Sequence, residues 1–150
     1  MKINFTKKQY RSLIDLIHLG DMVVNGIRTD DTVEEYEELR EYIYSFAKQM
    51  GQEDNIKYDK EYDRHFETRE YESGKVQEYI EDYDDEIFWT ELASRLATRD
   101  TQKLIMLTGE ISDKDEDLKK YWSREDIYQK EFEENGLRNV SVKFNKGKKS

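Results

Sequence analysis

Acidic residues at helical spacing have the clearest potential for chemistry in this chain. Glu34, Glu35 and Glu38 form an EExxE pattern, and Glu81 and Asp84 form an ExxD pattern further along. Carboxylates that converge from two helices can hold Mg²⁺ where it bridges the phosphates of a nucleotide. A magnesium-dependent enzyme that acts on nucleotides is therefore one hypothesis, and Mg²⁺ is the only cofactor that it implies.

The two patterns together resemble the magnesium-binding pattern of MazG-type nucleotide pyrophosphohydrolases, an all-helical family. The resemblance implies hydrolysis of a nucleoside triphosphate with Glu34, Glu35, Glu38, Glu81 and Asp84 as metal ligands. A solvated helix face explains the same residues, because acids in the first turn of a helix are stabilised by the helix dipole. We therefore rank this hypothesis second.

The distribution of charge supports a different hypothesis. Residues 30–91 contain 22 acidic and 7 basic residues, whereas the remainder contains 13 and 18, so about −15 and +5 sum to −10. Such a segment repels nucleic-acid backbones and anionic membranes and attracts basic surfaces. Our first hypothesis is a non-enzymatic protein without a cofactor that binds a basic partner protein, in the extreme form as a mimic of nucleic acid. The residues expected on its binding face are Glu34, Glu37, Glu38, Glu41, Tyr42, Tyr79, Glu81, Asp82, Asp84 and Asp85.

Other features narrow the classes of site. The chain has no cysteine, which excludes disulfides and thiolate metal ligands. His18, three residues after Asp15, and His65 are too few for a histidine metal site. We expect a surface or boundary position for His18 and an exposed loop for His65. No signal-peptide or membrane-spanning pattern is found, so we expect a cytoplasmic protein. Acidity that serves only solubility remains a third possibility, and the oligomeric state is left open.

The first half of the chain predicts two paired helices. Thr6 and Gln9 form a capping box that begins a helix over residues 7–27. A second capping box at Thr32 and Glu35 begins a helix that ends near Gly51. The short polar turn between these helices predicts an antiparallel hairpin.

The second half is less regular. Residues 52–73 lack periodicity and predict a long, partly helical connection. Short helices are expected over residues 75–83, after Asp84 and after Asp100, and a last long helix over residues 112–134. Asn135-Gly136 is a typical helix stop.

Both ends of the chain alternate between apolar and polar residues. Residues 1–5 and the segment Val140, Val142, Phe144 are expected to pair as a small sheet, because two isolated short strands are not stable. The predicted fold is mostly α: an irregular bundle of four to five main helices with a two-stranded sheet formed by the terminal segments. Residues 1–144 would form one domain, followed by a basic, flexible tail over residues 145–150.

Four segments carry a second resemblance. FTKKQYRSLIDLIHLGDMVVNGIR (residues 5–28), EYIYSFAKQMG (41–51), FETREYE (66–72) and EFEENG (131–136) are similar to a family of small bacterial hypothetical proteins. That family has no established activity, so the resemblance implies a bacterial source and no function.

Overall fold

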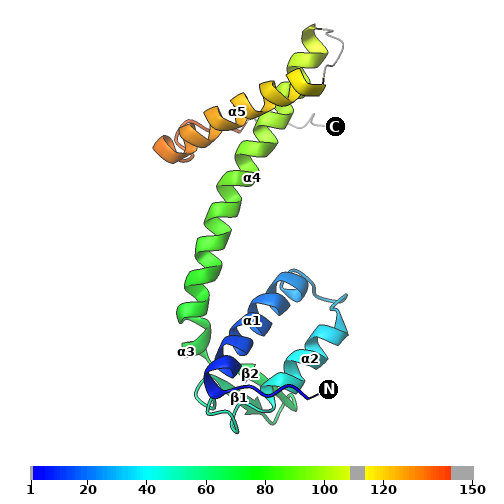
Figure 1. Ribbon diagram of the computed structural model, residues 1–150, viewed down its shortest axis with the longest axis vertical. Coiled ribbons are helices and arrows are strands. Elements are labelled where there is room, and N and C mark those ends of the chain that lie inside the picture. Colours follow the sequence, from blue (N-terminus) through cyan, green and yellow to red (C-terminus); the bar gives the residue numbers. More distant parts are fainter. Residues whose placement is uncertain (1, 109–113, 143–150) are drawn as a thin grey trace, which may run out of the picture. The chain divides into compact units, whose positions relative to one another are not determined.

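The computed structural model describes residues 2–108 and 114–142, and most of them are helical (Figure 1). The chain divides into two compact units, which we call the N-terminal unit (Met1–Asp82) and the C-terminal unit (Tyr83–Ser150) and describe separately. The predicted mostly α fold with a small two-stranded sheet is confirmed. A single domain over residues 1–144 stays a prediction, and the predicted tail over residues 145–150 lies outside the described residues.

The N-terminal unit begins with helix α1 (Lys7–Asn25), as its capping residues predict. Gln9 N–H donates to the Thr6 hydroxyl (3.2 Å), and Thr6 N–H donates to Gln9 Oε1 (2.9 Å), which completes the capping box. The helix ends at Asn25, where Gly26 follows as the C-cap residue.

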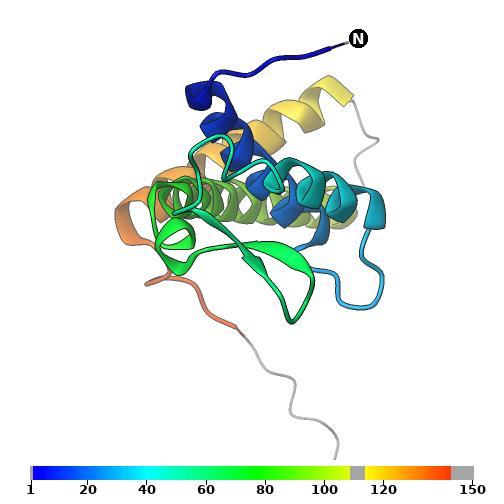
Figure 2. The same cartoon turned by 90° about the horizontal axis from the view of Figure 1, so that it is seen from below.

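Helix α2 (Glu34–Tyr44) returns antiparallel to α1, as predicted (Figure 2). Its N-cap is Val33, which provides no side-chain cap, so the predicted capping box at Thr32 and Glu35 is wrong. The Val33 amide is instead satisfied from α1, because it donates to Asn25 Oδ1 (2.9 Å). The acidic first turn of α2 adds stabilisation through the helix dipole.

The sheet is a local hairpin, so the predicted sheet between the termini is wrong. Strands β1 (Ile56–Asp59) and β2 (Arg64–Glu67) pair antiparallel, with Ile56 opposite Glu67 and Asp59 opposite Arg64. Residues 2–5, Val140 and Val142 are not in strands, while Met1 and Phe144 lie outside the described residues. The hairpin closes a short loop in which Asp59 Oδ1 accepts the Glu61 amide (2.7 Å). Closing it costs less chain entropy than joining the ends of the chain.

Tyrosines dominate the core of the N-terminal unit. Tyr10, Tyr44 and Tyr71 are buried in one cluster with Ile14 and Ile56. Each buried hydroxyl has an acceptor: the Ile43 carbonyl for Tyr10, Glu67 for Tyr44 and Asp15 for Tyr71. Burial raises the pKa of Tyr10 to about 12. The core of this unit therefore depends on polar partners as well as on packing.

After the short helix α3 (Arg69–Glu72), one long helix, α4 (Lys75–Thr108), replaces the three short helices that the sequence predicts. Asp84 and Asp100 lie within α4 and cap nothing. Asp100 instead accepts hydrogen bonds from Arg99 and from the Tyr128 hydroxyl. No glycine or proline interrupts residues 75–108, so the backbone continues past both aspartates.

In the C-terminal unit, the second part of α4 packs against helix α5 (Lys114–Asn135). Ala93, Ala97 and Thr101 are buried at four-residue spacing on α4, and Phe132 is buried on α5. Gly136 has φ +57° and ends α5 as predicted. Within residues 2–108 and 114–142, no helix combines the length and the apolar character that crossing a bilayer requires.

Candidate functional site

An acidic groove runs along helix α2 in the N-terminal unit. Positions 34, 37, 38 and 41 follow helical spacing, which brings their glutamates to one side of the helix. The groove has a volume of ≈ 520 Å³. We call it the α2 groove, and its lining residues are Thr32, Glu34, Glu37, Glu38, Glu41, Tyr42 and, from β2, Arg64.

Two glutamates of the α2 groove attach α2 to the hairpin. Glu37 Oε2 lies 3.1 Å from Arg64 Nη1. Glu41 accepts the His65 backbone amide (2.8 Å), and its other oxygen lies 2.6 Å from His65 Nδ1. His65 is therefore a partly buried strand residue, and the expectation of an exposed loop histidine is wrong.

The other two glutamates, Glu34 and Glu38, are exposed. Neither forms a hydrogen bond or an ion pair from its side chain within the part of the chain that the structure describes. Tyr42, on the same side of α2, is 61% exposed and contacts Phe46 edge to face (5.2 Å between ring centroids). The groove thus offers free carboxylates beside a large exposed ring.

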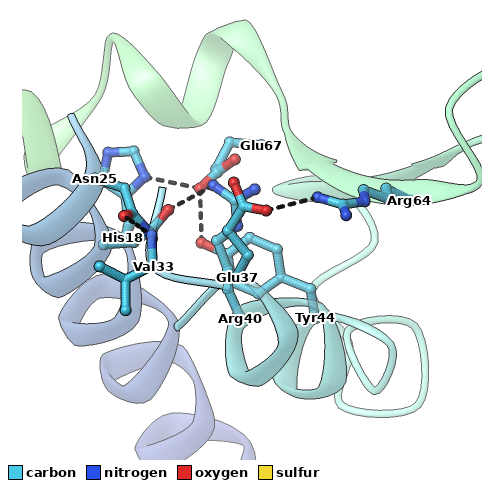
Figure 3. A network of polar contacts seen from close by, with 9 residues as sticks. His18, Asn25, Val33, Glu37, Arg40, Tyr44, Arg64 and Glu67 are labelled. Carbon is cyan, nitrogen blue, oxygen red and sulfur yellow. Dashed lines mark hydrogen bonds and ion pairs between the residues drawn. The ribbon is translucent and has the colours of Figure 1, made fainter. Parts of the chain in front are cut away.

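The N-terminal unit also contains a buried carboxylate, that of Glu67 (Figure 3). Glu67 of β2 is only 7% exposed at its side chain. Its Oε1 accepts the hydroxyl of Tyr44 (2.7 Å) and lies 2.8 Å from His18 Nδ1 of α1. One oxygen therefore ties β2 to both helices. We call His18, Tyr44 and Glu67 the buried triad.

The buried triad holds Glu67 ionised. Burial alone would raise the pKa of the Glu67 carboxyl, but hydrogen bonds from His18, from Tyr44 and from a backbone amide outweigh burial and lower the pKa to about 2. The pKa of Tyr44 is raised, first by burial and then by the charge and hydrogen bond of Glu67. The carboxylate is thus a fixed negative charge whose main role is to join three elements.

A second chain of polar contacts positions the beginning of α2. Asp21 of α1 accepts hydrogen bonds from Arg40 Nη1 and Asn25 Nδ2, both at 2.7 Å. Asn25 in turn accepts the Val33 amide. These contacts surround a smaller polar cavity of ≈ 330 Å³, which shares Thr32 and Glu37 with the α2 groove. The turn before α2 is therefore held by side chains of α1.

The structure divides the predicted binding residues between two helices. Glu34, Glu37, Glu38, Glu41 and Tyr42 line the α2 groove. The other predicted residues lie on α4, and several have partners there: the Tyr79 ring lies 5.4 Å from Lys75 Nζ, Glu81 accepts Gln77 Nε2, and Asp85 accepts Trp89 Nε1. The remaining α4 positions, which are exposed, are Asp82 and Asp84.

The predicted magnesium ligands lie on α2 and on α4. Within the described ranges 2–108 and 114–142, no three histidines, aspartates or glutamates are grouped so that they could hold a metal ion. Glu35 is exposed on α2 and does not line the groove. Asp15 and His18 also have separate partners, since Asp15 accepts the Tyr71 hydroxyl (2.8 Å) while His18 faces Glu67. The magnesium site therefore stays a prediction.

The contacts of several site residues were not predicted from the sequence. His18, Asp21 and Asn25 recur at positions i, i+3 and i+7 of a helix, so this polar stripe on α1 was a detectable signal. Glu67 and Tyr44 had no comparable signal, because their partnership spans 23 residues and depends on the hairpin.

The acidic segment as a whole remains largely unneutralised. Its residues 30–91 are all described. Asp31, Glu37 and Glu91 form ion pairs with arginines, and Glu41 and Glu67 contact histidines. Most of its 22 acidic residues therefore stay outside ion pairs within this described segment.

The low pKa of Glu67 predicts that the folded chain loses stability at acid pH, and the variant Tyr44→Phe tests this prediction. The pKa of Glu67 lies below its ordinary value of 4.5 in the folded chain, so its stabilisation is present above about pH 4.5 and is lost as the pH falls toward 2. At full strength this corresponds to about 3 kcal/mol. Without the Tyr44 hydroxyl, we expect the Glu67 pKa to rise toward 4.5 and the loss of stability between pH 6 and pH 2 to shrink.

Urea unfolding across that pH range, with a carboxyl NMR titration of Glu67, measures both effects. Tyr62→Phe is the control and should leave both unchanged, because Tyr62 is exposed and its hydroxyl has no partner among the described residues. An unaltered Glu67 pKa in Tyr44→Phe would contradict the role given to this hydroxyl.

Comparisons with protein-family models, with curated proteins and with solved structures found no match to this chain. The resemblances to MazG-type enzymes and to small bacterial hypothetical proteins therefore stay expectations, and the functional argument depends on the geometry of the chain itself.

Proposed function

We propose that this chain is a non-enzymatic interaction protein whose α2 groove binds a lysine- and arginine-rich segment of a partner protein. One observation carries the proposal: four glutamates from successive turns of a single helix line one groove, and the only basic side chain among its lining residues is Arg64. Arg64 is occupied by Glu37, so the free charge of the groove is that of Glu34 and Glu38. A basic side chain placed there could pair with these two carboxylates, and no existing contact would have to break.

Rigidity supports the same proposal. Glu41 is held by His65, and the Arg40–Asp21 pair and the buried triad join α2 to α1 and to β2. A groove whose backbone is already fixed loses little conformational entropy when a partner binds. Complementary charge then increases the rate of association and selects basic surfaces over acidic ones.

Tyr42 supplies contact area. Its ring is exposed beside the carboxylates, and tyrosine contributes a large surface with few rotatable bonds. The combination suits a segment in which basic residues alternate with apolar or aromatic ones. The same negative charge opposes binding of nucleic acids and anionic lipids.

The test is binding of a labelled lysine- and arginine-rich peptide to the full chain, followed by fluorescence anisotropy. We expect Glu34→Gln/Glu38→Gln to weaken binding about tenfold, because it removes the two free carboxylates of the groove. We also expect binding to weaken with increasing salt concentration.

The matched control is Glu53→Gln/Glu70→Gln, which removes two exposed glutamates of the same acidic segment outside the groove. It should change the affinity less than twofold. Equal losses in both double variants would show attraction by net charge alone and would contradict a groove-specific site. Absence of peptide binding at low salt would contradict the proposal altogether.

A further inference from the structure

A second pocket lies in the C-terminal unit, between the facing sides of α4 and α5. Glu86, Trp89 and Thr90 line it from α4 at positions i, i+3 and i+4, and Gln129, Phe132 and Glu133 line it from α5 with the same spacing. Its volume is ≈ 380 Å³. We call it the Trp89 pocket, and its lining combines two aromatic rings with a glutamate from each helix.

Neighbouring side chains position the two aromatic rings that line the pocket. The rings of Trp89 and Phe132 lie 5.5 Å apart between centroids at 39°, and the Tyr128 ring stacks on Phe132 (6.0 Å, 24°). Trp89 Nε1 donates to Asp85 Oδ1 (3.0 Å), which fixes the indole through a charged acceptor. The Trp89 ring also lies near the end of α5. Its Cη2 atom is 3.9 Å from the position that a Cβ atom would take at Gly136. Indole is the ring that attracts cations most strongly through its face.

The charge of the pocket favours the same kind of ligand. Glu133 lies in the last turn of α5, where the helix dipole is negative, and that turn contains no basic residue. The charge of Glu133 also acts on Lys130, one turn earlier, but the ammonium group of Lys130 contacts Asp126 (2.8 Å). Within the described part of the chain, neither Glu86 nor Glu133 forms an ion pair or a side-chain hydrogen bond. Two carboxylates and a helix C-terminus thus act on one aromatic pocket without a cation of the chain among its lining residues.

We propose that the Trp89 pocket binds an organic ammonium group, with its alkyl substituents against Trp89 and Phe132 and its positive charge near Glu86 and Glu133. A quaternary ammonium group suits it best, because aromatic rings and carboxylates stabilise such a cation without hydrogen-bond donors on the ligand. The shared chemistry covers small molecules such as choline and methylated lysine side chains of a protein. This site is independent of the α2 groove.

The test uses Trp122→Phe as the background, because Trp89 is then the only tryptophan and reports on its own pocket. Trp122 is 63% exposed and does not line the pocket, so its replacement should leave the pocket intact. The full chain is titrated with choline chloride at constant ionic strength, and Trp89 fluorescence is recorded. We expect a saturable change with a dissociation constant in the millimolar range, as one aromatic cation site provides. The neutral isostere 3,3-dimethylbutan-1-ol should produce no saturable change.

Two variants test whether choline binding depends on a carboxylate that lines the pocket. Glu133→Gln should weaken choline binding about fivefold, since a pocket carboxylate is lost at the negative end of α5. Glu134→Gln removes the same charge from the neighbouring residue, which does not line the pocket, and should have less than a twofold effect. A trimethyllysine peptide and an unmodified lysine peptide, titrated in parallel, distinguish a protein ligand from a small molecule. The proposal is overturned if choline gives no saturable change, if the neutral isostere matches it, or if Glu134→Gln weakens binding as much as Glu133→Gln.

Discussion

Replacing Glu67 with alanine is expected to lower the stability of the N-terminal unit by about 3 kcal/mol, since a hydrogen-bonded buried charge is removed and its donors remain. The hydroxyl of Tyr44, which is fully buried, would lose its acceptor, and so would the half-buried ring of His18. Water cannot solvate the Tyr44 hydroxyl without opening the core. The three elements joined by Glu67 would therefore loosen together.

Amide hydrogen exchange of α1, α2 and β2 residues at pH 7 measures this loss within the unit itself. Glu53→Ala is the matched control and should cost less than about 0.5 kcal/mol, because Glu53 is exposed and its side chain has no partner within residues 2–108 and 114–142. Glu67→Gln should fall between the two, because an amide oxygen can still accept the Tyr44 proton. If Glu67→Ala were no more disruptive than Glu53→Ala, the buried triad would not hold the unit together.

The other large effect is expected for Ile14→Ala, at about 3 kcal/mol. Ile14 has no exposed surface and lies in the same core cluster as Tyr10, Tyr44 and Tyr71. The chain is poor in apolar residues, so few neighbours can move to fill the space that Ile14 would leave. The loss of stability therefore includes the transfer free energy of the deleted atoms and the cost of the cavity that they leave.

Leu16→Ala is the control on the same helix, because Leu16 is 67% exposed and should cost less than about 1 kcal/mol. Both variants are compared by hydrogen exchange of α1 and by urea unfolding of the full chain. Similar losses of stability in the two variants would contradict the placement of Ile14 on the buried side of α1 and of Leu16 on its exposed side.

Much of the N-terminal unit was predictable from local sequence. The capping box at Thr6 and Gln9 sets the beginning of α1, and its atoms lie within three residues of each other. The antiparallel return of α2 follows from a short polar turn between two amphipathic segments. The glutamates of α2 could be assigned to one side of the helix from their spacing alone.

Other elements could not be predicted because their sequence signals are ambiguous. Asp84 and Asp100 are typical cap residues, yet aspartate within a helix costs only a few tenths of a kcal/mol. The tertiary contacts of Asp100 with Tyr128 favour a continuous α4. The alternation at the two chain ends resembled strands, but the hairpin at residues 56–67 pairs across a short loop and has a neighbouring helix to pack against.

Local sequence is sufficient to predict the helical class, the first two helices and the concentration of negative charge, because these depend on spacing and composition within one or two turns. Long-range contacts determine which carboxylates are free and which are structural. Glu34 and Glu38 remain exposed, whereas Glu67 is buried against residues 49 and 23 positions away. Whether a carboxylate is solvated or buried depends on contacts between distant segments, and no local pattern encodes that difference.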